Sequence, residues 1–95
     1  MYIVVTTFYA LPGKLPELIG VIHEYNKTFG IGGMVLTPVA GKLSEVKFRS
    51  QVETLSEYEE QTKKAQAHKE YPAFVQKVAA LVVPGVAHTD IYREV

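Results

Sequence analysis

Along this chain, segments in which apolar residues have the period of a strand are followed by segments in which they have the period of a helix. Residues 2–10 (YIVVTTFYA) are rich in β-branched and aromatic types, which favours a strand. Both alternate sets of side chains in this segment are largely apolar, so both faces of the strand are expected to be covered.

The next segment has the period of an amphipathic helix, with apolar side chains every three or four residues. These are Leu15, Leu18, Ile22, Tyr25 and Phe29. Pro16 is tolerated in a first helical turn, and Gly30 stands where a C-cap glycine is expected. The pattern predicts one helix over residues 15–29.

The strand period returns after Gly32 and Gly33. Residues 34–40 are predicted to form a second strand, with Pro38 at an edge or a bulge because proline cannot donate to a ladder. Residues 44–53 alternate and predict a third strand. Its less polar face, expected under the helices, carries Val46, Phe48, Ser50 and Val52, and its polar face carries Glu45, Lys47, Arg49, Gln51 and Glu53.

A capping box then opens a second helical segment. Thr54 and Glu57 have the spacing for reciprocal hydrogen bonds at a helix N-terminus, which predicts a helix over residues 55–69. Tyr71-Pro72 interrupts it and begins a shorter helix. Residues 86–95 alternate again and predict the last strand.

The order β-α-β-β-α-β predicts a single α+β domain over residues 1–95. With right-handed crossovers, this order gives a ferredoxin-like plait, a four-stranded antiparallel sheet with the helices on one face. Because the first strand is apolar on both faces, the second face is expected to be covered by another copy of the chain. A back-to-back homodimer through the sheet is therefore the predicted assembly.

Three segments resemble the NIPSNAP-like family of the dimeric α+β barrel superfamily. They are Tyr9–Leu18 (YALPGKLPEL), Gly41–Glu60 (GKLSEVKFRSQVETLSEYEE) and Asp90–Arg93 (DIYR). Phe48 and Ser50 stand where that family often carries His and Trp. The resemblance implies the fold, the dimer and a ligand position between the sheet and the helices. Relatives in the superfamily include cofactor-free monooxygenases of antibiotic biosynthesis and haem-degrading enzymes.

Composition narrows the classes of partner. Ten basic residues balance ten acidic ones and no basic tract occurs, which argues against nucleic acid as a partner. The apolar N-terminal segment breaks at Pro12-Gly13, well short of the length that spans a bilayer, so no membrane association is expected. The chain has no cysteine, which fits a reducing compartment, and we expect a cytoplasmic protein.

The three histidines give little indication of metal binding or of acid–base catalysis. His23, His68 and His88 have no metal-ligand spacing, so no metal and no cofactor are expected. His68, at the end of the second helical segment, is the catalytic candidate, with a capping role as the alternative. His88 shares a strand face with Asp90, which suits a hydrogen bond at a dimer interface. No nucleophile elbow is present.

A group of aromatic residues and one threonine forms the candidate ligand-binding set. They are Tyr9, Phe48, Tyr58, Thr62, Tyr71 and Phe74. The weak apolar stripe around Tyr58 and Thr62 indicates a helix that packs loosely on the sheet, as a small-molecule site requires. A place in the hydrophobic core is the alternative for most of the aromatic ones.

Three functions are considered, of which the second and third are implied by the resemblance to the superfamily. The first is a small homodimeric protein that binds a small, aromatic ligand. The second is a cofactor-independent monooxygenase in which His68 acts as acid or base, and Tyr58 and Tyr71 orient the substrate. The third is a haem-binding or haem-degrading protein with a histidine as axial ligand. The sequence leaves open whether the protein is an enzyme.

Overall fold

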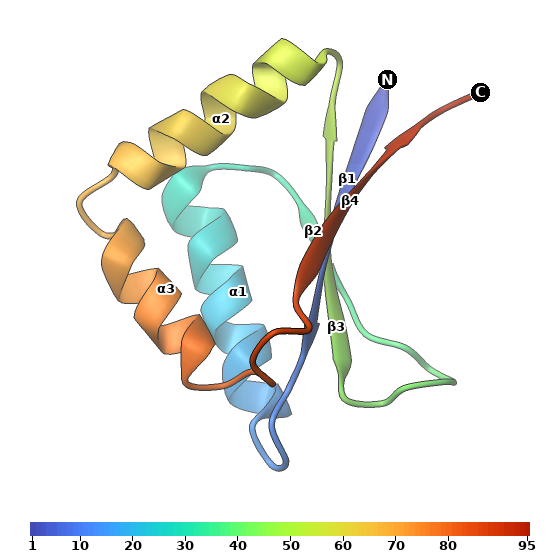
Figure 1. Cartoon of the computed structure of the whole chain (residues 1–95), viewed down its shortest axis with the longest axis vertical. Coiled ribbons are helices and arrows are strands. Elements are labelled where there is room, and N and C mark those ends of the chain that lie inside the picture. The colour runs from blue at the N-terminus through green and yellow to red at the C-terminus, as the bar shows by residue number, and fades with distance from the viewer.

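The computed structural model describes all residues of the chain, 1–95, as three helices and four strands (Figure 1). In chain order they are β1 (Tyr2–Tyr9), α1 (Leu15–Phe29), β2 (Met34–Leu36), β3 (Glu45–Val52), α2 (Leu55–Ala67), α3 (Tyr71–Ala79) and β4 (His88–Arg93). The helix predicted over residues 15–29 is confirmed, as is the break before Tyr71.

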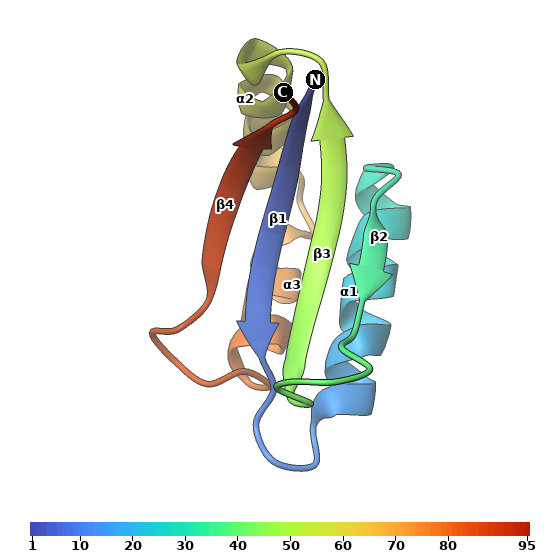
Figure 2. The ribbon, with the colours of Figure 1, turned by 90° about the vertical axis from the view of Figure 1, so that its right-hand side faces the viewer.

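The four strands form one antiparallel sheet in the order β2-β3-β1-β4. All three helices lie on one side of this sheet (Figure 1), and Figure 2 looks onto the opposite side, where no helix lies. The architecture is the α+β, ferredoxin-like plait predicted from the sequence. None of its helices combines the length and the apolar character needed to cross a membrane.

The register of the sheet decides which side chains face the helices. Val4 pairs with Ser50, Thr6 with Phe48, and Phe8 with Val46, so the even positions of β1 share the helix-covered face with the even positions of β3. The odd positions of β1 share the uncovered face with the charged positions of β3. The two faces predicted for residues 44–53 are confirmed.

The core lies between β1, β3 and the helices. Seven buried residues form its main cluster: Ala10, Leu18, Ile22, Val46, Phe48, Leu81 and Val82. Leu18 and Val46 are completely buried and connect α1 to the middle of the sheet. This half of the molecule is well packed, and α2 takes little part in it.

The second strand and the last strand are shorter than predicted. β2 ends at Leu36 because Pro38 cannot donate to the ladder, and Val39 beyond it is fully exposed. β4 begins only at His88, and all six of its residues are exposed. Both edges of the sheet are therefore lightly covered.

The N-terminus of α2 is capped by Thr54, whose Oγ1 accepts from the Glu57 amide at 3.1 Å. The Glu57 carboxylate accepts from the amide of Glu53 at 2.9 Å, one residue before the position that a capping box predicts. The helix ends at Ala67, two residues earlier than predicted. Only Ala65 is buried among its residues, so the cap matters more here than in a well-packed helix.

Candidate functional site

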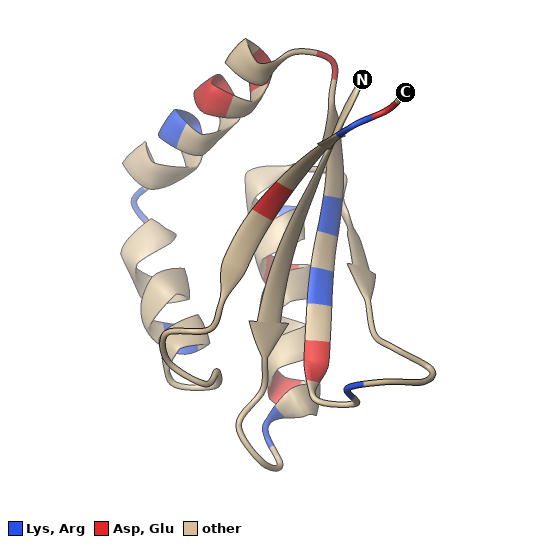
Figure 3. Ribbon diagram, turned by 45° about the vertical axis from the view of Figure 1, so that its right-hand side comes forward, with Lys and Arg blue, Asp and Glu red and all other residues tan.

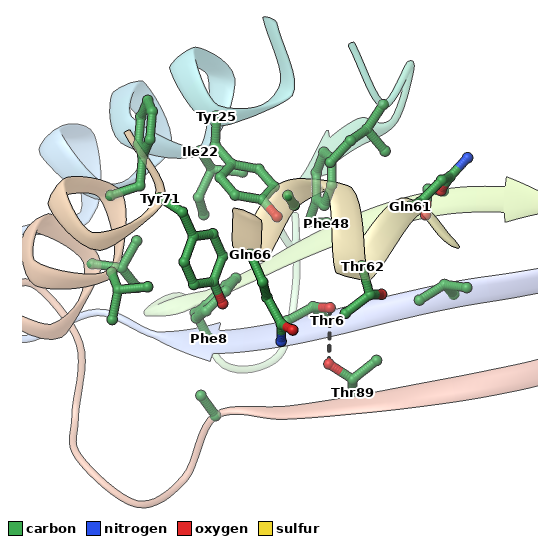
Figure 4. A pocket seen from close by; sticks show the side chains of 18 of the residues that line it. Thr6, Phe8, Ile22, Tyr25, Phe48, Gln61, Thr62, Gln66, Tyr71 and Thr89 are labelled. Atoms are coloured by element: carbon green, nitrogen blue, oxygen red, sulfur yellow. Dashed lines mark hydrogen bonds between the residues drawn. The ribbon is translucent and has the colours of Figure 1, made fainter. Parts of the chain in front are cut away.

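A cavity of about 490 Å³ lies between the helix-covered face of the sheet and the helices. Phe8 and Phe48 belong to its sheet side, Tyr25 comes from α1, Thr62 from α2 and Phe74 from α3. Figure 4 shows these elements around one interior space, with α2 as one wall. The volume falls in the range of small-molecule sites.

An aromatic cluster forms one side of the cavity. The ring of Tyr25 lies 4.6 Å from that of Phe29, 5.8 Å from Phe74 and 6.2 Å from Phe48, measured between centroids. The last two pairs meet edge to face, an arrangement that aromatic quadrupoles favour. These contacts hold the rings in fixed orientations, so this wall of the cavity is preformed.

The polar groups of the cavity are hydroxyls and amides. The hydroxyls of Thr6 and Thr89 are hydrogen-bonded to each other at 3.0 Å across β1 and β4 (Figure 4). The other polar lining residues are Tyr25, Ser50, Tyr58, Gln61, Thr62, Gln66 and Tyr71. No Asp, Glu, Lys, Arg or His lines the cavity, so it has no charged side chain at neutral pH. With the three tyrosines counted for their rings, 15 of its 21 lining residues are hydrophobic.

The phenol of Tyr25 is less acidic than a phenol in water. Burial raises the pKa of Tyr25, and the nearby phenols of Tyr71 and Tyr58 raise it further. Desolvation disfavours the phenolate, and a second or third ionised phenol nearby would repel it. Tyr25 therefore keeps its proton over the whole physiological pH range and acts as a hydrogen-bond donor.

Five of the seven residues predicted for the site meet at this cavity. Phe48, Tyr58, Thr62, Tyr71 and Phe74 all line it, although they come from β3, α2 and α3. Phe74 and Phe48 are also buried, so they serve the core and the cavity together.

Tyr9 and His68 lie elsewhere. Tyr9 pairs with Glu45 on the uncovered face of the sheet, where the Lys42 ammonium lies 5.3 Å from its ring. The Nδ1 atom of His68 accepts from the Glu70 amide at 3.1 Å, and its ring packs edge-on against Phe29 at 4.9 Å. His68 occupies the C-cap position of α2 and does not line the cavity.

Sequence reasoning missed several lining residues. Tyr25 was assigned to the apolar stripe of α1, but its hydroxyl end reaches the cavity. Gln61 and Gln66 follow Tyr58 and Thr62 at helical spacing, which was the available signal for them. Thr6 was recognisable as the polar position on the inner face of β1.

The uncovered face of the sheet carries both apolar and charged side chains. Lys47 contacts the Glu45 carboxylate at 3.5 Å and donates to the Thr7 hydroxyl at 3.0 Å, while His88 lies 3.4 Å from Asp90. Figure 3 shows basic positions along β3 and an acidic position on β4. No group of three or more His, Asp or Glu side chains is placed to hold a metal ion.

The fold and its interior cavity define the class of this chain as a ferredoxin-like α+β protein. The sequence matches no protein-family model and no curated protein sequence. Among solved structures, it is similar to an uncharacterised NIPSNAP domain protein from Burkholderia xenovorans, with a TM-score of 0.83 and 16% identity over 100% of this chain and 95% of that one.

Two further solved structures have the same fold. A NIPSNAP family protein from Agrobacterium tumefaciens matches with a TM-score of 0.83 and 17% identity, over 99% of this chain and 85% of that one. An antibiotic biosynthesis monooxygenase matches with a TM-score of 0.75 and 9% identity, over 100% and 99%. The resemblance found in the sequence is therefore confirmed at the level of the fold.

Proposed function

We propose that this protein is a homodimeric binding protein for a small, uncharged, mainly apolar molecule held between the sheet and the helices. The observation that carries the proposal is the cavity of about 490 Å³, whose lining is mostly hydrophobic and has no charged side chain. A charged ligand would lose its hydration there without gaining an ionic partner. An uncharged ligand with an aromatic ring fits the preformed aromatic wall.

The oxygenase alternative finds little support in this site. A general base must reach the proton that it abstracts, and the cavity offers no carboxylate, imidazole or amine. His68, the residue expected to act as acid or base, is occupied at the end of α2. The haem alternative lacks its axial ligand, since none of the three histidines lines the cavity.

The proposed dimer is supported by the chemistry of the uncovered sheet face. Met34 and Leu36 of β2 and Tyr92 of β4 are exposed there, 52%, 38% and 54% respectively. Arg49 makes no ion pair within the chain. In the sheet, Val5 of β1 pairs with Arg49 of β3 on one side and with Asp90 of β4 on the other. Such a face, with both charge signs beside apolar groups, is self-complementary under two-fold symmetry.

Ligand binding is tested with two probes of one carbon skeleton, indane and indane-1-carboxylate, in ¹⁵N NMR titrations. We expect indane to shift amide resonances of α2, α3 and β1, and the carboxylate to bind at least tenfold more weakly. The variant Thr62→Trp fills the cavity and should abolish indane binding, whereas Glu59→Trp, at an exposed position on the same helix, should not. Equal binding of both probes, or no binding of indane, contradicts the proposal.

The dimer is tested by light scattering at micromolar concentration. The wild-type protein should have the mass of two chains and Arg49→Glu the mass of one, because the reversal places unbalanced negative charge on the sheet face. Lys63→Glu changes the charge equally on an exposed part of α2 and should remain dimeric. A monomeric wild-type protein refutes the assembly without affecting the ligand site.

A further inference from the structure

We infer that the phenols of Tyr25 and Tyr71 together bind a carbonyl oxygen of the ligand, so that the protein selects uncharged aromatic carbonyl compounds. This inference rests on the proposed binding function and specifies its ligand class. It assigns a role to Tyr25, whose position on the apolar stripe of α1 suggests only a core residue.

The position of the Tyr25 hydroxyl is determined by its surroundings. Its ring contacts those of Phe29, Phe48 and Phe74, from three different elements, at centroid distances of 4.6, 6.2 and 5.8 Å. A ring in contact on several sides has little rotational freedom, so its hydroxyl group points in one direction. Figure 4 shows that this direction is into the cavity.

Tyr71 brings a second phenol to the same region from the start of α3. Figure 4 shows its hydroxyl turned toward the space next to Gln66 and Thr6. Both tyrosines line the same cavity, and Figure 4 shows both hydroxyl groups inside it. Two donors that face one cavity suit an oxygen with two lone pairs, which a carbonyl group provides.

Neither phenol has a partner within the chain. The side-chain hydrogen bonds of the molecule involve Thr6, Asn26, Lys47 and other residues, but no tyrosine. The free donor capacity of the site is therefore directed at whatever occupies the cavity.

The absence of charged side chains from the cavity decides which carbonyl compounds bind. A carboxylate would also accept from two phenols, but no Lys, Arg or His lines the cavity to offset its desolvation. Ketones, esters and amides present the same oxygen without the charge. The aromatic wall formed by Phe48 and Phe74 favours a planar ring next to that oxygen.

The experiment compares 1-indanone with indane, which share the ring system and differ by the carbonyl oxygen. In ¹⁵N NMR titrations of the full chain we expect wild-type protein to bind 1-indanone at least about fivefold more tightly than indane, because each of the two hydrogen bonds contributes about two- to tenfold. Tyr25→Phe and Tyr71→Phe should each remove most of this preference and leave indane affinity unchanged. Tyr2→Phe, at a tyrosine that does not line the cavity, should have no effect.

The outcomes separate the two proposals. If indane binds and both variants keep the wild-type preference for 1-indanone, the binding function stands and the phenol pair is refuted. If wild-type protein shows no preference between the two probes, the inference is again refuted. If neither probe binds, both proposals fail. Each phenylalanine variant keeps the aromatic ring, and its amide spectrum without ligand verifies that the fold is intact.

Discussion

Gly33 lies where α1 connects to β2, and the substitution Gly33→Ala tests how tightly this connection packs on the cavity. An added Cβ would lie 2.6 Å from Cζ of Phe48 and 2.9 Å from the Arg49 carbonyl oxygen. The Phe48 ring would have to move by nearly an ångström to reach ordinary contact at 3.4 Å, and the backbone oxygen has less room to yield. Asn26 further fixes this point with two 2.9 Å hydrogen bonds to the Gly33 backbone.

Overpacking of this kind costs about 1–3 kcal/mol of unfolding free energy. For a domain of this size each kcal/mol lowers Tm by roughly 4–8 °C. The matched control is Gly20→Ala, in the middle of α1 with no atom within 4 Å of its added Cβ. That change should stabilise the protein by about 0.5–1 kcal/mol, because alanine favours the helix.

The assay is urea unfolding followed by circular dichroism, at one protein concentration so that any association contributes equally. Gly33→Ala should unfold at lower urea than wild type, and Gly20→Ala at higher urea. The NMR signals of the Phe48 ring should shift only in Gly33→Ala. If Gly33→Ala unfolds at the wild-type midpoint, the reasoning from the short Cβ distances is wrong.

Three further predictions concern α2, the aromatic cluster and the buried phenol. Thr54→Ala should lose about 1 kcal/mol of unfolding free energy through the missing cap, measured by urea unfolding against the exposed control Ser56→Ala. Phe74→Ala should lose about 3–5 kcal/mol, whereas Val39→Ala, at a fully exposed position, should change thermal stability little. Tyr25 ionises at higher pH folded than unfolded, so its contribution to stability should be constant below about pH 10 and be lost as the pH rises from there through the folded pKa. The measurement is phenolate absorbance as a function of pH for wild type and for Tyr25→Phe. The difference between the two curves, one tyrosine, should develop above about pH 10. If Tyr25 titrates together with the exposed phenols, the reasoning is refuted.

The sequence predicted most of the fold because its periods are strong. The stripe of α1, the proline at Tyr71-Pro72 and the alternation of β3 each determine local structure, and their order leaves few topologies. The shorter β2 shows the limit of this reasoning. Pro38 was recognised as an obstacle to pairing, but only the structure shows that pairing stops at Leu36.

The candidate site was harder to predict because it depends on register and side-chain direction. Tyr9 differs from Phe8 by one position, and that single step places it on the opposite face of the sheet. Tyr25 shares its stripe with Leu18 and Ile22, and periodicity cannot show that its far end reaches a cavity. The loose packing of α2, in contrast, was visible in its composition.

The small contribution of α2 to the core has a consequence for protein engineering. Its inner side supplies Tyr58, Gln61, Thr62 and Gln66 to the cavity, while Ala65 is its one buried residue. Large losses of stability come from core cavities and broken buried networks, and none of these four side chains belongs to either. Under the proposed binding function, a combinatorial library at these four positions should therefore change ligand preference while α1 and β3 keep the fold intact. Four of the five α2 residues that line the cavity therefore lie outside the buried core.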